Sequence, residues 1–265
     1  MGKFDGYLLL SDFDGTLAHV EHEIIDGKRR AIKVISRENC DAIRYFQSEG
    51  GLFTLATGRS FDWLKQWSTH FVPNTYVVSY NGAHICSPDG KEVLFSRPLD
   101  GDYVELAERI RIACPDLEWV HFHSLDETPR FLKGETIDRE QFHAPIFKMV
   151  FYAHRIQAEE YAKTVANLID DRYVSMRSWV NGIEILMRGA TKGEAIKHLK
   201  VALGDRARTV VAVGDYENDT DMIVSADIGY AVENCVPSLR AAADRLTVRC
   251  DESAIARIIE ELERT

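Results

Sequence analysis

Residues 7–16 read Tyr-Leu-Leu-Leu-Ser-Asp-Phe-Asp-Gly-Thr, an apolar run that passes directly into an acidic turn. This stretch decides the fold, because it is typical of a buried strand of a parallel sheet that presents side chains at its carboxyl end. Nearly extended backbone projects Asp12 and Asp14 toward the same side. Carboxylates this close repel each other unless a cation lies between them, and magnesium prefers oxygen ligands. For this stretch alone, an Asp-Gly turn capped by its acids is the alternative.

A second acidic cluster over residues 215–219, Asp-Tyr-Glu-Asn-Asp, follows an apolar run and precedes a predicted helix. Ligands of open α/β sheets bind beyond the carboxyl ends of the strands, so the two clusters predict one shared site. Helix capping is the alternative for Asp215 and Asp219, and the presence of the first cluster weakens it.

Thr57 and Lys192 also lie where predicted elements end or begin. The Thr57 hydroxyl and the following backbone amides can donate to a phosphoryl oxygen, although a Thr-Gly turn is usually only a turn. Lys192 opens a predicted helix, where its charge opposes the helix dipole. A phosphoryl group and nearby carboxylates would compensate for that position, whereas an exposed lysine is the alternative.

The alternation of predicted strands and helices along the chain predicts a doubly wound α/β core interrupted by an α+β module. The first part predicts strands over 7–10, 52–56 and 75–79, a helix over 39–49 after a polar loop, and a helix beginning after Ser60. From Lys192 the same rhythm returns, with a helix over 192–203, strands over 209–213 and 228–232, and helices beginning at Asp219 and after Ser253.

The stretch between these parts departs from parallel-sheet alternation. It predicts a β-hairpin over 84–95, helices over 102–113 and 158–169, and strands over 118–123, 146–152, 174–179 and 182–187. We therefore predict a core of residues 1–82 and 191–265 and an inserted module of residues 83–190. Glycines at the two crossings permit hinge-like changes of the backbone.

Composition restricts the classes of partner. The 265 residues carry a net charge of −10, which disfavours polyphosphate backbones and anionic membranes, and we expect no nucleic-acid, membrane or protein partner. An acidic protein still binds phosphates where a cation or ordered donors reverse the sign locally. The five cysteines form no Cys-x-x-Cys pair, and the first apolar run is too short for a signal peptide, so a cytoplasmic location is expected.

Taken in order, the clusters resemble the motifs of the haloacid dehalogenase superfamily, and within it those of the Cof-like sugar phosphatases with a type IIB (C2B) cap. Residues 12–17 resemble the first motif, 57–59 the second, 192–193 the third and 214–219 the fourth. Residues 79–83, Ser-Tyr-Asn-Gly-Ala, resemble the entry into the cap. The resemblance covers essentially the whole chain and implies a Rossmann-like catalytic core with a cap that selects small phosphorylated metabolites.

The resemblance also implies a role for each motif residue. Asp12 is expected to attack phosphorus and form an aspartyl phosphate, while Asp14 acts as general acid and then as general base. Magnesium is expected on Asp12, on the backbone carbonyl of Asp14 and on Asp215. The residues expected to bind phosphate are Thr57, Gly58, Lys192 and Asn218. Asp219 is expected to orient Lys192 or a metal-bound water.

Three other functions share parts of this pattern. A phosphosugar mutase uses the same intermediate but returns the phosphoryl group to sugar. A signalling receiver also accepts phosphate on aspartate, but its acceptor closes a later strand and it needs no inserted module. A sugar-phosphate sensor would bind without turnover, which the retention of Asp12 and Asp14 argues against.

The predicted cap residues carry no motif that names a leaving group. His121 and His123 share one face of a predicted strand, but no third ligand of zinc type is evident, so a metal role is disfavoured. Trp119 and Trp179 suit packing of the module better than stacking on a sugar. The candidates for contact with the leaving group include Trp119, His121, Arg130, Lys148, Arg177 and Glu184.

Overall fold

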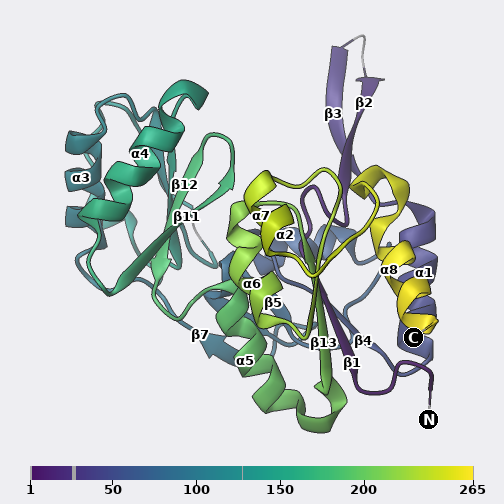
Figure 1. Ribbon diagram of the computed structural model, residues 1–265. Coiled ribbons are helices and arrows are strands. Elements are labelled where there is room, and N and C mark those ends of the chain that lie inside the picture. Colours follow the sequence, from purple (N-terminus) through teal and green to yellow (C-terminus); the bar gives the residue numbers. More distant parts are fainter. Residues whose placement is uncertain (1, 26–27, 127, 265) are drawn as a thin grey trace.

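A five-stranded parallel sheet forms the centre of the larger part of the molecule (Figure 1). The computed structural model describes residues 2–25, 28–126 and 128–264. The three leucines of β1 are fully buried, as expected for a strand covered on both faces. In spatial order the strands are β15 (Arg245–Leu246), β14 (Ile228–Ala231), β13 (Thr209–Gly214), β1 (Tyr7–Ser11) and β4 (Leu52–Leu55).

Helices cover both faces of this sheet, which confirms the predicted doubly wound α/β core. One face packs against α1 (Arg37–Ser48) and α8 (Ala254–Glu263), and the other against α5 (Lys192–Leu203), α6 (Thr220–Ser225) and α7 (Pro237–Ala242). Ser36 caps α1 by accepting a hydrogen bond from the Asn39 backbone N–H. None of the helices within the described ranges is long and apolar enough to cross a membrane.

The order of the strands brings the two acidic loops together. The chain passes from β1 to β4 on one side and later returns to β13 on the other side of β1, with all these pairings parallel. The Asp12 backbone N–H donates to the Val213 carbonyl oxygen across this boundary, at 2.9 Å. The boundary between β1 and β13 is therefore the switch point at which open α/β sheets bind their ligands.

A second, antiparallel sheet lies to one side of the core and carries its own two helices on one face (Figure 1). Val120 and Phe122 of its strand β8 are fully buried beneath these helices, while Trp119, His121 and His123 alternate to the other face. We call this part the cap. It contains, in spatial order of strands and then helices, β11 (Tyr173–Trp179), β12 (Gly182–Met187), β10 (Lys148–Tyr152), β8 (Trp119–His123), β9 (Arg130–Leu132), α3 (Tyr103–Ala113) and α4 (Arg155–Leu168).

A three-stranded antiparallel sheet connects the core and the cap. It consists of β5 (Val77–Ser79), β6 (His84–Cys86) and β7 (Val93–Ser96). Ile85 of β6 packs with core residues such as Leu8, whereas Ala83 packs with the cap. The hairpin predicted over 84–95 is therefore present, and it packs partly against the core. The division of the chain into domains at residues 82 and 190 stays a prediction.

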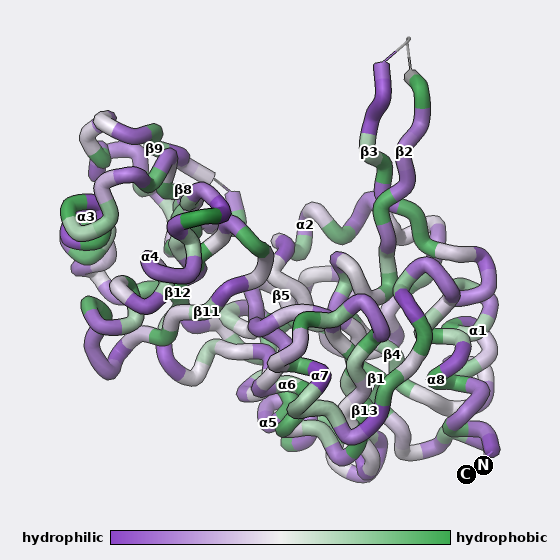
Figure 2. Tube along the Cα trace, turned by 45° about the horizontal axis from the view of Figure 1, so that its top comes forward, coloured by the Kyte–Doolittle hydropathy of each residue, from purple (hydrophilic) through white to green (hydrophobic). Residues whose placement is uncertain are grey.

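The segment predicted as a polar loop before the first helix is instead a long β-hairpin, so that prediction is wrong. Strands β2 (His19–Ile25) and β3 (Lys28–Val34) pair in antiparallel register and stand out from the core, apart from the cap (Figures 1 and 2). Glu23 lies directly opposite Arg30, a cross-strand pair of opposite charges that favours pairing although most side chains are polar. Apolar alternation is weak here, so sequence periodicity did not reveal it.

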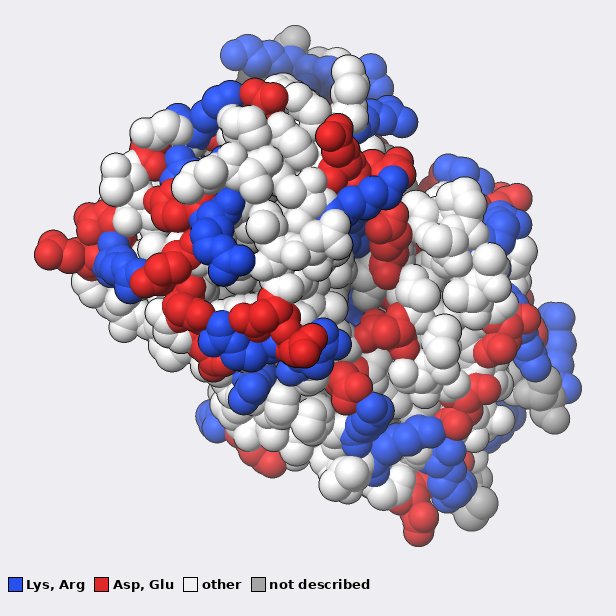
Figure 3. All heavy atoms as spheres, turned by 60° about the vertical axis from the view of Figure 1, so that its left-hand side comes forward, with Lys and Arg blue, Asp and Glu red and all other residues white. Residues whose placement is uncertain are grey.

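The surface distribution of charge is uneven around this hairpin. The cations Lys28, Arg29 and Arg30 follow one another in β3, and Figure 3 shows lysine and arginine gathered where the hairpin ends. Elsewhere on the face shown, acids and bases alternate over short distances. The −10 net charge is therefore not spread evenly, and one projecting arm is basic.

The aromatic cluster under the first acidic loop should control stability. Phe13 is fully buried between Asp12 and Asp14, and its ring centroid lies 5.2 Å from those of both Trp63 and Trp67. We expect Phe13→Ala to reduce the free energy of unfolding by about 3–5 kcal/mol, through lost contacts and the cavity left behind. Urea unfolding followed by circular dichroism measures this.

Ile156→Ala is the matched control for that measurement, because Ile156 is 95% exposed. Its free energy of unfolding should stay within about 0.5 kcal/mol of the wild type. Equal effects of the two substitutions would contradict a role of Phe13 in anchoring the loop.

Candidate active site

Three carboxylates meet at the switch point between β1 and β13. One oxygen each from Asp12, Asp215 and Asp219 can be chosen such that all three lie within 4.8 Å of one another. Asp12 directly follows β1 and Asp215 directly follows β13, so adjacent parallel strands deliver the two acids to one edge. The two predicted acidic clusters therefore form one site.

Asp219 is held by the protein itself, because both of its oxygens accept hydrogen bonds. Its Oδ2 accepts hydrogen bonds from the backbone N–H groups of Asp215 at 3.0 Å and Tyr216 at 3.1 Å. Its Oδ1 accepts from Lys192 Nζ at 2.6 Å. With these bonds in place, Asp219 fixes the loop and the lysine, and Asp12 and Asp215 are left to face a cation.

Oxygens around Asp12 and Asp215 suit a magnesium ion. Asp12 uses one oxygen for Lys192, at 2.6 Å, and its second oxygen accepts no hydrogen bond from any described residue. The carbonyl oxygen of Asp14 likewise accepts none within the described part of the chain. Gly15 has a φ of +82°, and a Cβ there would lie 2.4 Å from Asp215 Oδ2, so only glycine allows this close approach.

The electrostatics of the centre also favour the binding of a cation. Burial and the neighbouring acids raise the pKa of Asp12 to about 7, despite the opposing charge of Lys192. Burial, Asp12 and Asp219 together raise the pKa of Asp215 to about 9. Buried carboxylates that repel each other in this way are stabilised by a cation, and hard oxygen ligands favour magnesium.

Lys192 connects the centre to the second half of the core. Its side chain is fully buried at the start of α5 and forms ion pairs with Asp12 and Asp219, both at 2.6 Å. These carboxylates supply the compensation that a cation at a helix start requires, and they hold the pKa of Lys192 above its usual range even though burial opposes this. The alternative of an exposed lysine is wrong.

Thr57, Gly58 and Asn218 line the same pocket as the acids. Thr57 follows β4 and is buried, and its hydroxyl oxygen accepts from the Arg59 backbone N–H at 3.2 Å. The Gly58 backbone N–H has no acceptor among the described residues. The predicted phosphate-binding residues therefore lie beside the predicted nucleophile, with at least one donor unused.

Asp14 lies between two cations that the sequence did not assign to it. Arg59 donates to both of its oxygens, from Nε at 2.8 Å and from Nη2 at 3.1 Å, and Lys33 of β3 forms a close ion pair with it. Burial alone would raise the pKa of Asp14, but these cations hold it below its usual range. Arg59 could have been noted because it follows Thr57-Gly58, whereas no sequence signal pointed to Lys33.

The cap forms the opposite wall of the pocket, which has a volume of about 650 Å³. Its lining includes four of the predicted contacts, Trp119, His121, Lys148 and Glu184, together with His123 and Trp179. The two tryptophans thus border the pocket, and Trp119 also stacks on Tyr152 at a centroid distance of 5.1 Å. Packing inside the cap, which the sequence analysis favoured for these two tryptophans, is therefore not their only role in the structure, because both also form part of the pocket wall.

Two predicted cap contacts do not line the pocket. The Arg130 guanidinium lies over the Trp119 ring, 6.0 Å from its centroid, and Arg177 lies 3.6 Å from the Glu217 carboxylate. His121 and His123 are adjacent, with ring centroids 4.2 Å apart, and neither belongs to a group of metal-ligating side chains among the described residues.

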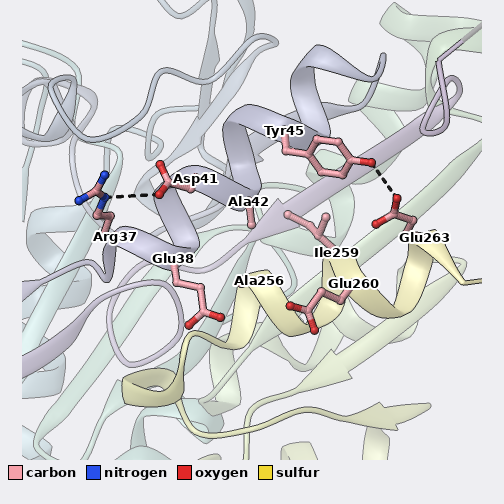
Figure 4. Close-up of a pocket in the computed structure, with 9 residues that line it drawn as sticks. All are labelled: Arg37, Glu38, Asp41, Ala42, Tyr45, Ala256, Ile259, Glu260 and Glu263. Carbon is pink, nitrogen blue, oxygen red and sulfur yellow. Dashed lines mark hydrogen bonds and ion pairs between the residues drawn. The ribbon is translucent and has the colours of Figure 1, made fainter.

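A second hollow, of about 630 Å³, lies between α1 and α8 and contains none of the predicted site residues (Figure 4). Its polar side chains largely satisfy one another. Tyr45 donates to Glu263 at 2.7 Å, and Arg37 lies 3.5 Å from Asp41. The pocket between core and cap is therefore the candidate active site.

Comparison with known proteins assigns the family. The haloacid dehalogenase-like hydrolase family matches residues 9–259, so the chain belongs to that family and is a hydrolase. A putative phosphatase of Bacillus subtilis, YxeH, is 24% identical and the match covers 96% of this chain and 97% of the relative. The resemblance deduced from the ordered motifs is confirmed.

Solved structures of the same fold cover nearly the entire chain. BT1666 of Bacteroides thetaiotaomicron, described among phosphatases of the superfamily, superimposes with a TM-score of 0.78 at 20% identity, covering 97% of this chain and 94% of that one. The subclass IIB sugar phosphatase BT4131 gives 0.74 at 19% identity, with 96% and 98% covered. These likenesses confirm the fold, with an antiparallel sheet added to a parallel core.

We expect magnesium to stabilise the protein through Asp215. Magnesium chloride should raise the melting temperature of the wild type, because binding to the folded state alone adds about 2.7 kcal/mol at a hundred times the dissociation constant. In Asp215→Asn this response should disappear. Without metal the variant should be at least as stable as the wild type, because one buried acid is gone. Differential scanning calorimetry with and without EDTA measures both effects.

Asp251→Asn serves as the control, since this acid is exposed and pairs with Arg249 at 3.1 Å. It should keep the full magnesium response. An undiminished response in Asp215→Asn would mean that the metal is held elsewhere.

His123 should make the cap sensitive to acid. Burial, Lys148 and His121 lower the pKa of His123 to about 2, far below the value of about 6.5 in the unfolded chain. The unfolded state then binds the extra proton, so stability is lost as the pH falls below about 6.5. His123→Asn should reduce this loss by up to about 1.4 kcal/mol per pH unit, as measured by urea unfolding between pH 7 and pH 5.

The control is His154→Asn, because His154 is largely exposed and lies 2.8 Å from Glu118. It should keep the steep acid loss of the wild type. A wild-type slope in His123→Asn would show that His123 is free to protonate in the fold.

Proposed function

We propose that this protein is a magnesium-dependent phosphatase that hydrolyses small phosphate monoesters, with sugar phosphates as the first class to test. The observation that carries the proposal is the position of Asp12. Lys192 fixes one of its oxygens at 2.6 Å, the other oxygen accepts no hydrogen bond from a described residue, and Asp12 and Asp215 line the same pocket. A fixed carboxylate next to a cation site is a competent nucleophile.

In the first step, the free oxygen of Asp12 attacks phosphorus, and the bond between phosphorus and the leaving oxygen breaks. The leaving oxygen takes a proton from Asp14, which must itself gain that proton once the entering substrate displaces Arg59 or Lys33 and so removes charge that holds its pKa low. Magnesium on Asp12, the Asp14 carbonyl and Asp215 would withdraw charge from the phosphoryl group. In the second step, Asp14 accepts a proton from water, the water oxygen bonds to phosphorus, and the bond between phosphorus and Asp12 breaks, which releases inorganic phosphate and regenerates the Asp12 carboxylate.

Arg59 and Lys33 constrain the proton transfers of Asp14. Both of its oxygens have a cation within ion-pairing distance. To reach the leaving oxygen, Asp14 must exchange at least one of these contacts for the substrate. The two cations therefore act as positioning residues that hold the acid at the rim of the pocket until a substrate enters.

The remaining predicted residues suit the binding of the phosphoryl oxygens. Thr57 and Gly58 line the pocket from the loop after β4, and Asn218 lines it from the loop after β13. Lys192 would balance the charge of the phosphoryl group while Asp219 orients its ammonium. Trp119 and Trp179 on the cap offer flat surfaces to an uncharged sugar ring.

The same proposal includes the compartment. All five cysteines are free thiols, four of them buried, which suits a reducing environment such as the cytoplasm.

The protein should release inorganic phosphate from p-nitrophenyl phosphate and from several hexose and pentose phosphates only when magnesium is present. Asp12→Asn should reduce the turnover number by at least about 1,000-fold, since it removes the nucleophile but keeps the side-chain shape. A colorimetric phosphate assay across a panel that includes nucleotides measures both effects, with EDTA as the metal-free reference.

The control variant is Asp89→Asn in the exposed turn between β6 and β7, which should retain full activity. Activity that survives EDTA would contradict the metal site, and substantial turnover by Asp12→Asn would point to a different nucleophile. Conversion of a hexose 1-phosphate into its 6-phosphate without phosphate release would favour the mutase alternative.

A further inference from the structure

One cation of the cap extends into the phosphate-binding end of the pocket. Lys148 begins β10 on the cap, its residue is only 3% exposed, and it lines the pocket together with Thr57, Gly58 and Asn218. A Cβ placed on Gly58 would lie 3.4 Å from Lys148 Nζ. The ammonium is thus in near contact with the loop whose backbone amide is free to bind phosphate.

The ammonium of Lys148 has donors to spare. It carries three N–H groups, and Glu184 Oε2, at 2.7 Å, is the one acceptor that it has among the described residues. The Glu184 carboxylate is already shared, since Asn81 Nδ2 donates to the same oxygen at 2.6 Å and Ser178 donates to the other. The remaining donors of Lys148 therefore have no acceptor among the described residues, and the residue lines the pocket.

Glu184 and Asn81 hold this cation in place from both parts of the molecule. Glu184 belongs to β12 of the cap, and Asn81 lies at the crossing from the core, where its oxygen accepts from Asn218 Nδ2 at 3.1 Å. Asn81 and the preceding Tyr80 have φ values of +58° and +49°, a conformation that costs energy in residues other than glycine. These strained residues lie where a hydrogen-bonded network joins the core to the cap.

We propose that Lys148 is a phosphate-binding residue supplied by the cap, which completes a cradle otherwise made by the core alone. The inference rests on the proposed function, because it assigns a further contact to the same phosphoryl group. Phosphate recognition then requires the cap to be in place, since the core contributes Lys192 from one side and the cap contributes Lys148 from the other. The Asn81–Glu184 contact positions the lysine without touching the substrate.

A purely structural ion pair is the competing explanation. Buried pairs of this kind are often no more stabilising than well-packed apolar residues, so stability alone gives little reason to place one in a pocket wall. The location of the pair beside Gly58 and Asn218 is what a ligand-binding role requires. The two explanations differ in what happens when both charges are removed together.

The test measures the binding of inorganic phosphate to the magnesium-loaded protein by isothermal titration calorimetry. Phosphate has no leaving group, so contacts of the cap with a sugar do not contribute. Lys148→Met should weaken binding at least tenfold, while Lys133→Met, which removes an exposed cap lysine paired with Asp116, should bind like the wild type.

The double variant Lys148→Met with Glu184→Met guards against misfolding, because it leaves no unpaired buried charge. A folded double variant that also binds phosphate at least tenfold more weakly supports the proposal. Wild-type affinity in the folded double variant overturns it and leaves the phosphatase assignment intact. A wild-type protein that neither binds phosphate nor hydrolyses esters overturns the proposed function and this inference together.

Discussion

Mutual repulsion of buried carboxylates at the ends of β1 and β13 is the constraint on which the rest of the structure depends. Asp12, Asp215 and Asp219 are brought within a few ångströms of one another by parallel strand pairing. The fully buried Lys192 at the start of α5 forms ion pairs with two of them, Asp12 and Asp219. The core helix, the tight turn at Gly15 and the backbone amides that hold Asp219 all serve to keep this unfavourable cluster together.

The fold of the core was largely predictable because its sequence signals are physical and local. The leucine run of β1, the glycine stop after α1 and the returning alternation after Lys192 each reflect burial or backbone freedom. The hairpin of β2 and β3 was missed because its strands are mostly polar and solvated on both faces, so no apolar alternation marks them. Residues 26 and 27, between these two strands in the sequence, lie outside the described residues.

The site was predictable to the extent that its residues follow strand ends. Asp12, Thr57 and Asp215 could be grouped on this basis, since the carboxyl ends of parallel strands share one edge. Arg59 on Asp14 and Asn81 on Glu184 are different, because these contacts join segments whose distance depends on tertiary packing. The cap wall was the least predictable part. The face of β8 that lies toward the core is determined by where α3 and α4 pack, and the alternation of residues in β8 does not identify that face.

The charges explain how a protein with a net charge of −10 can accept an anionic substrate. Around the pocket, the carboxylates of Asp12, Asp14, Asp215, Asp219 and Glu184 face the cations Lys33, Arg59, Lys148 and Lys192. If all are ionised, the acids exceed the cations by one, and the pocket repels phosphate. A divalent ion reverses that sign. In the proposed phosphatase, metal binding and substrate binding would therefore be coupled by electrostatics, since the ion would relieve the crowded acids and the phosphoryl group would in turn balance the ion. The cap contributes to the same balance from the opposite wall, where Glu184 pairs with Lys148 and, under the proposal above, the remaining donors of this lysine would bind the ligand.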